Sequence, residues 1–355
     1  MARRSGRRDS GAVKGVVLGV IGLLVVVLAV AGVGVYSYFF KPEAKVANGT
    51  PVNVTVSKGA GSEAIANQLA DAGVVSNANL FLLSVKESGK GSKLKPGAYK
   101  LAAGMPHDKI IDVLVEGPAV KTYTVTIPEG WRIEQMAARY AAEAQIPEDE
   151  FLTLAKTGAK EFAGNHPYLA DAYNGSLEGF LFPKTYTIRD GSSARDVIEM
   201  MLDQFDKEIA SVDLAAAAKK NLTLSDVVNI AAIVERETKL AEERPKVASV
   251  IYNRLHLKMR LQMCSTVVYV LNKKEMRLTI AETRVDSPYN TYINAGLPPG
   301  PIASPGLSSL QAAAHPADTK YIYYVLTGKN GSHTFAKNNA DFLTAKRKSK
   351  EVFGK

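Results

Sequence analysis

Two glutamates in the segment AAIVERETKL, Glu235 and Glu237, are candidates for proton-transfer chemistry. The preceding residues predict a helix, because Thr223 or Ser225 can cap it ahead of apolar residues at helical spacing. At about 100° per residue, Glu237 continues the apolar stripe, whereas Glu235 falls on the opposite side with Asp226 and is expected to be solvated. Desolvation disfavours a charged carboxylate and therefore suits Glu237 to general acid catalysis, although pairing with an arginine is the commoner fate of a half-buried glutamate.

The other residue types that support catalysis show no comparable pattern. The chain has five histidines without metal-ligand spacing and a single cysteine, Cys264, for which we expect a buried structural role. It contains neither a phosphate-binding loop nor a GxSxG nucleophile motif. We therefore expect no metal and no cofactor, and the sequence gives no support for nucleotide or serine-hydrolase chemistry.

An N-terminal apolar segment indicates how these residues are positioned relative to a membrane. Residues 16–40 carry no charge, and basic residues precede them, which contributes to the net charge of +9. The segment is longer than the roughly 20 residues that span a bilayer, and the basic flank places the N-terminus in the cytoplasm. We predict a single-pass helix in the cell membrane and an extracytoplasmic body, with a cleaved signal peptide ending near Ala31 as the alternative. Nucleic acid is not an expected partner there.

The exported part contains an internal duplication. The segment VTVSKGAGSEAIANQLADAGVV from Val54 aligns without gaps to VTIPEGWRIEQMAARYAAEAQI from Val125. Each copy predicts a strand that ends at a glycine, Gly59 or Gly130, followed by an amphipathic helix, and a second strand, turn and helix follow later. The second copy has an inserted segment, NHPYLADAYNGSLEGFLFP, whose apolar residues suggest packing against the next domain.

These features predict an α+β protein with successive domains. A basic tail is expected at 1–14, a transmembrane helix at 15–40 and a linker at 41–51. The first α+β unit is expected at 52–120 and the second at 121–208. Residues 209–355, where helical sequence gives way to loops rich in proline, glycine and tyrosine, are the expected catalytic domain.

Several segments resemble the endolytic murein transglycosylases of the MltG, or YceG-like, family. They are AAIVERET, SLEGFLFPKTYTI (176–188), KVASVIYNRL (246–255), SPYNTYINAGLPPGPIASPG (287–306), AAAHPADTKYIYYV (312–325) and HTF (333–335). In lytic transglycosylases the catalytic glutamate is followed by serine or threonine, so the resemblance selects Glu237, as the helical phase does. The chain departs from the family after Leu261-Gln262, where an acidic residue is frequent and this chain has Met263-Cys264-Ser265.

The resemblance implies that the two α+β units are LysM-like and that the enzyme cleaves the β-1,4 bond between N-acetylmuramic acid and N-acetylglucosamine. The product has a 1,6-anhydro end, because the C6 hydroxyl of the substrate replaces water as the nucleophile. Glu237 would act first as acid and then as base. The implied substrate-binding residues are Tyr289, Asn290, Thr291, Tyr292, Glu178 and Gln262, with core packing as the alternative role of the tyrosines.

The resemblance further implies that the enzyme acts on nascent glycan strands beside the membrane and terminates their elongation. Glycan polymerases and penicillin-binding proteins are the implied protein partners. Two alternatives remain open: a non-catalytic peptidoglycan-binding division scaffold, which the duplicated unit favours, and a lysozyme-like hydrolase, which would release reducing ends.

Overall fold

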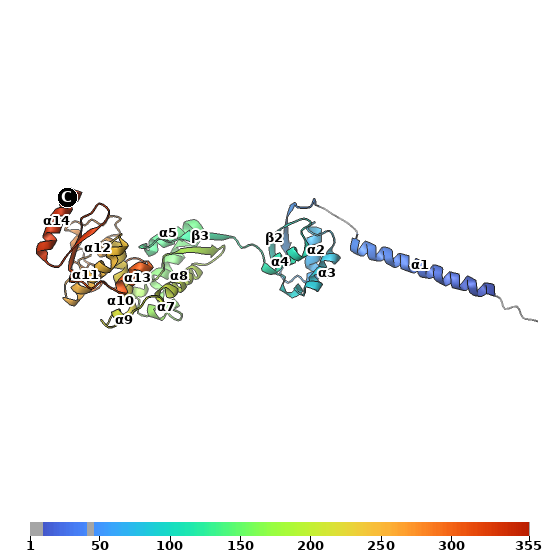
Figure 1. The fold of residues 1–355 in the computed structure, drawn as a ribbon, viewed down its shortest axis with the longest axis horizontal. Coiled ribbons are helices and arrows are strands. Elements are labelled where there is room, and N and C mark those ends of the chain that lie inside the picture. The colour runs from blue at the N-terminus through green and yellow to red at the C-terminus, as the bar shows by residue number, and fades with distance from the viewer. Residues whose placement is uncertain (1–9, 41–45, 355) are drawn as a thin grey trace, which may run out of the picture. The chain divides into compact units, whose positions relative to one another are not determined.

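The computed structural model describes residues 10–40 and 46–354, which form parts of two compact units, residues 1–120 and 121–355 (Figure 1). The basic cluster at residues 3–8 and the first part of the expected linker, residues 41–45, lie outside the described residues. The fold is a mixed α+β fold, as predicted.

The apolar segment near the N-terminus forms one long helix, α1 (Ser10–Phe40). Its stretch Leu18–Ser37 has a mean hydropathy of 2.8 and contains 20 residues, which at 1.5 Å each extend about 30 Å. This length matches the hydrocarbon core of a bilayer. Within residues 10–40 and 46–354, α1 is therefore the one helix that is long and apolar enough to cross a membrane.

The first unit continues with a small α+β layer built on one antiparallel strand pair. Strand β1 (Pro51–Val56) pairs with β2 (Gly97–Ala102), and the register places Val54 opposite Tyr99. Val54 and Tyr99 are buried against the apolar faces of the helices. These helices are α2 (Ser62–Asp71), α3 (Ala78–Ser88) and α4 (His107–Glu116), with a 3-10 turn at Gly91–Lys93 between α3 and β2.

The second unit opens with the same order of elements. Strands β3 (Thr122–Thr126) and β4 (Thr185–Arg189) pair antiparallel, with Val125 opposite Tyr186. The matching helices are α5 (Ile133–Ala144), α6 (Glu148–Thr157) and α8 (Ala194–Ile209), and the additional short elements are α7 (Ala159–Phe162) and the 3-10 turns Pro167–Leu169 and Tyr173–Gly175. Gly59 and Gly130 both have positive φ, +81° and +73°, in the turn before the first helix of each copy. The duplicated strand, helix, helix, strand, helix order is thus present in both copies.

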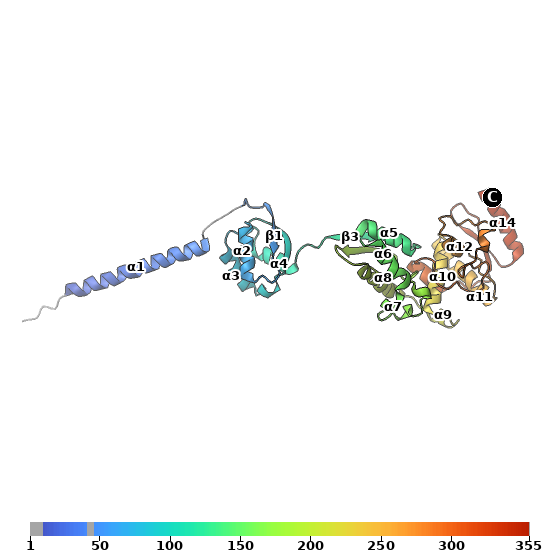
Figure 2. The same ribbon diagram turned by 180° about the vertical axis from the view of Figure 1, so that it is seen from behind.

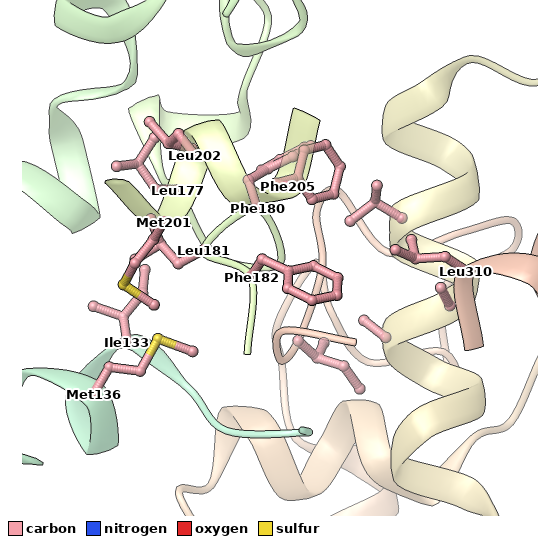
Figure 3. Packing of buried hydrophobic residues seen from close by; sticks show 14 of the residues in the cluster. Ile133, Met136, Leu177, Phe180, Leu181, Phe182, Met201, Leu202, Phe205 and Leu310 are labelled. Carbon is pink, nitrogen blue, oxygen red and sulfur yellow. The ribbon is translucent and has the colours of Figure 1, made fainter. Parts of the chain in front are cut away.

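The last part of the segment inserted into the second copy, residues 177–183, is buried, as its apolar residues predicted. Phe180, Leu181 and Phe182 are at most 6% exposed, and Figure 3 shows Phe180 beside Phe205 of α8. Gly179 has φ +87°, and a Cβ at this position would overlap Pro301 and lie 3.1 Å from Val228 Cγ1. The insertion therefore packs against α8 on one side and against α10 (Leu224–Glu237) on the other.

The rest of the second unit is built around α10 (Leu224–Glu237), which packs against α11 (Arg244–His256) and α12 (Cys264–Val270) (Figure 2) and also against α13 (Leu307–Ala314). Thr223 caps α10, since its hydroxyl accepts from Asp226 N and Asp226 accepts from Thr223 N. The remaining elements are α9 (Ala215–Ala218), the 3-10 turn Ala241–Glu243, α11 (Arg244–His256), α12 (Cys264–Val270), the 3-10 turn Glu282–Arg284, α13 (Leu307–Ala314), β5 (Tyr323–Leu326), β6 (His333–Ala336) and α14 (Asn339–Phe353). One apolar core extends from Val125 to Ala314 and includes residues on both sides of residue 208. The expected division into separate domains at residue 208 therefore stays a prediction.

Candidate active site

Glu237 lies in the last turn of α10 and is held by two hydrogen-bond donors from distant parts of the chain. Its Oε1 accepts from the backbone N of Ser265 at 3.0 Å, and its Oε2 accepts from the Tyr324 hydroxyl at 2.8 Å. Ser265 belongs to the first turn of α12, where backbone N–H groups have no partner within the helix. The carboxylate is half-buried and has no lysine or arginine partner within the described residues. It is therefore oriented by neutral donors and keeps access to solvent.

Tyr324 is the side chain that orients Glu237 from the opposite wall. Strand β5 presents it, and its hydroxyl lies 3.0 Å from Met263 Sδ as well as 2.8 Å from Glu237 Oε2. Burial raises the pKa of the Tyr324 hydroxyl well above 10.0, and the nearby Glu237 charge raises it further. The hydroxyl consequently keeps its hydrogen and can direct it to either of two acceptors.

Glu237 faces a cleft of about 830 Å³ between the end of α10, the start of α12 and the β5–β6 hairpin. The charged residues that line it are mostly cationic: Arg236, Lys239, Lys274 and Lys329, against Glu235 and Glu237. This charge pattern attracts an anionic ligand. The volume of the cleft lies within the range of about 300–1,000 Å³ that is typical of ligand-binding pockets.

Glu235, the second glutamate of the pair, is not solvated, and the prediction from helical phase was wrong. Its side chain is 8% exposed and accepts three hydrogen bonds, from Arg244 Nη2 at 3.1 Å, Gly306 N at 3.1 Å and Ser309 Oγ at 2.7 Å. The reason is that α10 is buried on all sides over Val227–Val234. On such a helix the side opposite the apolar stripe faces protein rather than water. Glu235 joins α10 to α13 and has no free oxygen to offer a substrate.

A third carboxylate, Glu243, lies near the cleft but is also fully engaged. It is 6% exposed, and it accepts from His333 N at 2.9 Å and lies 2.7 Å from His333 Nδ1. Thr238, the residue that follows Glu237 in the sequence, donates its hydroxyl hydrogen to the Glu243 carboxylate at 3.4 Å. His333 lines the cleft, whereas Glu243 fixes the His333 ring from behind.

Cys264 lines the cleft beside Glu237 and contacts Tyr292. The Cys264 thiol lines the cleft and lies 3.1 Å from the Tyr292 hydroxyl. Burial, with the Glu237 charge, raises the pKa of Cys264 to about 11, so the thiol stays protonated at neutral pH. Cys264 is half-buried in the cleft wall rather than fully buried.

The neighbouring residues of the YNTY segment brace loops instead of facing the cleft. Asn290 is fully buried and donates both amide hydrogens, to Thr283 O and Val285 O. Thr291 is 1% exposed, and its hydroxyl accepts from Met263 N at 2.9 Å. Gln262 is exposed with φ +49°, and its backbone N donates to Thr291 O. Thr291 and Gln262 thus fix the chain that leads into α12, and thereby the N–H group that holds Glu237, whereas Asn290 holds the loop at residues 283–290.

Glu178 and Tyr289 line a separate cavity of about 80 Å³ between the inserted segment, the first half of α10 and the loop at residues 298–301. Glu178 is 2% exposed, and burial raises its pKa to about 8, with the Glu134 charge adding to the effect. Its Oε2 accepts from Ile133 N at 3.4 Å, whereas its Oε1 has no partner among the described residues. Tyr289 packs against Tyr269, with ring centroids 5.0 Å apart. The structure thus groups Glu237 with Tyr292, and Glu178 with Tyr289.

Sequence reasoning missed Tyr324, although the segment YIYYV was noted for its resemblance. The alternation of a strand would have placed Tyr324 on the face opposite to Tyr323. Nothing in the sequence, however, connects this strand with Glu237, which lies 87 residues earlier. The Ser265 N–H group was equally invisible, because a backbone donor has no side-chain signature.

Comparisons with known proteins agree over most of the chain. Residues 54–348 match the YceG-like family. The endolytic murein transglycosylase of Bacillus subtilis is 35% identical over 313 residues, which cover 84% of this chain and 85% of that protein. That of Streptococcus pneumoniae R6 is 29% identical over 82% of this chain and 57% of its own length. A crystal structure of a YceG-like protein from Listeria monocytogenes superposes with a TM-score of 0.58 at 31% identity, covering 83% of this chain and 99% of that one.

Proposed function

The chain belongs to the YceG-like family, and we propose that it is an endolytic murein transglycosylase in which Glu237 is the single catalytic carboxylate. It is a peptidoglycan lytic transglycosylase, as its relatives are named. The observation that supports the assignment of Glu237 is the difference in hydrogen-bond partners between the two glutamates of α10. Glu235 is tied to Arg244, Gly306 and Ser309, whereas Glu237 is held by neutral donors and faces the open space.

One free carboxylate suits an intramolecular displacement better than hydrolysis. Glycoside hydrolases place a second carboxylate about 5–9.5 Å from the acid, as nucleophile or as the base that activates water. In the proposed reaction the Glu237 carboxyl protonates the glycosidic oxygen as its bond to C1 of N-acetylmuramic acid breaks. The C6 hydroxyl then attacks C1 and returns its proton to the Glu237 carboxylate. The products are a 1,6-anhydro end and a free 4-hydroxyl on N-acetylglucosamine.

Tyr324 supports both halves of this cycle. With Glu237 ionised, the tyrosine hydroxyl donates to Oε2, as in the structure. With Glu237 protonated, the same hydroxyl can turn its hydrogen toward Met263 Sδ and leave its lone pair for the carboxyl group. The rotation needs no movement of the ring, so the carboxyl oxygen stays aimed at the substrate.

The cationic lining of the cleft supports binding of an anionic glycan strand. N-acetylmuramic acid carries a lactyl group and a peptide with carboxylates, which Lys239, Lys274 and Lys329 can approach. Tyr292 is the aromatic group of the YNTY segment closest to the chemistry, through Cys264. Glu178, Tyr289 and Gln262 would act at a more remote part of the strand, while Asn290 and Thr291 would shape the loop.

The N-terminal half supports action close to the membrane. Helix α1 would anchor the enzyme with its N-terminus in the cytoplasm and the catalytic unit outside. The repeated strand, helix, helix, strand, helix units would be LysM-like and guide the glycan. In this arrangement the enzyme would terminate nascent strands and work beside glycan polymerases and penicillin-binding proteins.

Digestion of purified glycan strands by the full-length enzyme in detergent tests the proposal. Mass spectrometry of the products should detect 1,6-anhydro ends with the unmodified chain and at least a hundredfold fewer with Glu237→Gln, because a general acid contributes about 10²–10⁴ in rate. Reducing ends in their place would identify a hydrolase. Equal activity of Glu237→Gln would remove Glu237 from the chemistry, and no products from either protein would favour a binding scaffold.

A further inference from the structure

A second cluster of titratable groups lies outside the cleft, between the loop after α7 and helix α8. His166 is 1% exposed and faces two carboxylates of α8, Glu199 and Asp203, which are one helical turn apart. One ligand atom from each of the three residues lies within 4.8 Å of the other two. An imidazole and two carboxylates are a donor set that divalent transition metals bind.

The hydrogen bonds of His166 leave one ring nitrogen without a partner. Nδ1 lies 2.8 Å from Asp206 Oδ2, and Asp206 is held in turn by the Tyr168 hydroxyl, which donates to its Oδ1 at 2.8 Å. Nε2 is buried and has no hydrogen-bond partner within the described residues. A carboxylate that accepts from one ring nitrogen places the lone pair on the other, which is how metal-binding histidines are oriented. The unpartnered nitrogen points toward Glu199, whose Oε1 is 3.6 Å away.

The charges of the cluster are also unbalanced. Within residues 46–354, Glu199, Asp203 and Asp206 form no ion pair with a lysine or arginine. Asn165 donates to Glu199 Oε1 at 2.7 Å, which fixes the carboxylate but adds no positive charge. Three carboxylates around one imidazole therefore create a local demand for a cation.

We propose that His166 Nε2, Glu199 and Asp203 bind a divalent transition metal ion, with zinc as the best fit, and that this ion ties the loop at residues 163–172 to α8. Two ligand atoms of a tetrahedral zinc site with bonds of 2.0–2.1 Å lie about 3.4 Å apart. The distance from His166 Nε2 to Glu199 Oε1 is 3.6 Å, close to this value. Asp203 is exposed, so the remaining position opens to water. The tied loop leads directly into the segment that carries Glu178 and Phe180. This proposal differs from the expectation of no metal, which rested on the lack of a short spacing between ligands. Glu199 and Asp203 follow His166 by 33 and 37 residues, so no short motif reveals the site.

The test uses the full-length chain in detergent after removal of metal with EDTA. Addition of zinc should give one bound ion per chain by elemental analysis and a melting temperature about 5–10 °C higher at a hundredfold excess over Kd. Glu199→Gln and Asp203→Asn should each lose the bound ion and the shift. Glu143→Gln, which removes an exposed carboxylate from α5 of the same unit, should lose neither.

The remaining arms separate a metal site from a simple ion pair of protonated His166 with its carboxylates. Calcium and magnesium should give no comparable shift, because they prefer oxygen ligands and the site contributes a ring nitrogen. Absence of bound zinc, equal binding by Glu199→Gln, or an equal shift with calcium would each overturn the proposal. Because these readouts do not involve glycan cleavage, they are independent of the assignment of Glu237.

Discussion

The two glutamates of α10 provide a matched pair of variants with opposite expected effects. In Glu235→Gln, an amide replaces a carboxylate that is 8% exposed and accepts from Arg244, Gly306 and Ser309. The amide oxygen can accept from Gly306 N and Ser309 Oγ. The NH2 group then faces the Arg244 guanidinium, which is also a donor, so the hydrogen bond to Arg244 is lost. The remaining acidic partner of Arg244 is Glu129, at 3.7 Å.

The size of this effect follows from the burial of the pair. Removing one partner of a buried ion pair costs about 3–5 kcal/mol, and the residual contact with the second acid reduces this to about 2–4 kcal/mol. For a domain of about 150–250 residues, each kcal/mol lowers the melting temperature by about 2–4 °C. Glu235→Gln should therefore melt about 5–15 °C below the unmodified chain. In Glu237→Gln, an amide replaces a half-buried carboxylate whose hydrogen-bond donors are neutral. This variant should melt within about 3 °C of the unmodified chain.

Activity should change in the opposite sense. At a temperature well below both midpoints, Glu235→Gln should release anhydro-ended fragments within about threefold of the unmodified rate, whereas Glu237→Gln should lose at least a hundredfold. Circular dichroism gives the midpoints, and mass spectrometry of digested strands gives the rates. If Glu235→Gln were inactive with an unchanged midpoint, the assignment of the two roles would be refuted.

Four further outcomes follow from the site and its surroundings. Tyr324→Phe should lower kcat by about 10- to 100-fold with little change in KM, because Glu237 loses an orienting donor; an unchanged kcat in single-turnover digestion would contradict this. Since burial raises the pKa of Glu178 from 4.5 to about 8, the folded state binds more protons than the unfolded state between these values, and stability should fall as pH rises through this window. Urea titrations across that range should show a flatter dependence for Glu178→Gln. Gly179→Ala should lower the melting temperature by about 5–10 °C, because a side chain there is strained by the positive φ and by overlap; a midpoint within 2 °C would contradict the packing. Cys264→Ser should keep activity within about threefold, and complete inactivation would revive a role for the thiol.

The sequence predicted the elements of the site better than their environment. Local signals were sufficient for the cap at Thr223, for the turn glycine at Gly130 and for the burial of Phe180, because each depends on a few neighbouring residues. Glu235 was assigned to solvent because helical phase assumes that one side of a helix is wet. Asn290 is assigned to substrate by the resemblance alone, and the sequence does not show that its amide hydrogens go to the backbone, since a polar side chain in a loop gives no sign of whether its partner is a ligand or the chain itself.

Thr238 shows how a short motif can position a residue far away in the sequence. It adopts an extended conformation and ends α10 directly after Glu237, and its hydroxyl accepts from Leu240 N and donates to Glu243. Glu243 holds the backbone N and the ring of His333, the first residue of β6. Pairing of β6 with β5 in the register that places His333 opposite Leu326 then fixes Tyr324 two residues away. The residue that ends α10 thus contributes to the register of the strand whose tyrosine orients Glu237, which gives the Glu-Thr pair a physical basis beyond its resemblance to other transglycosylases.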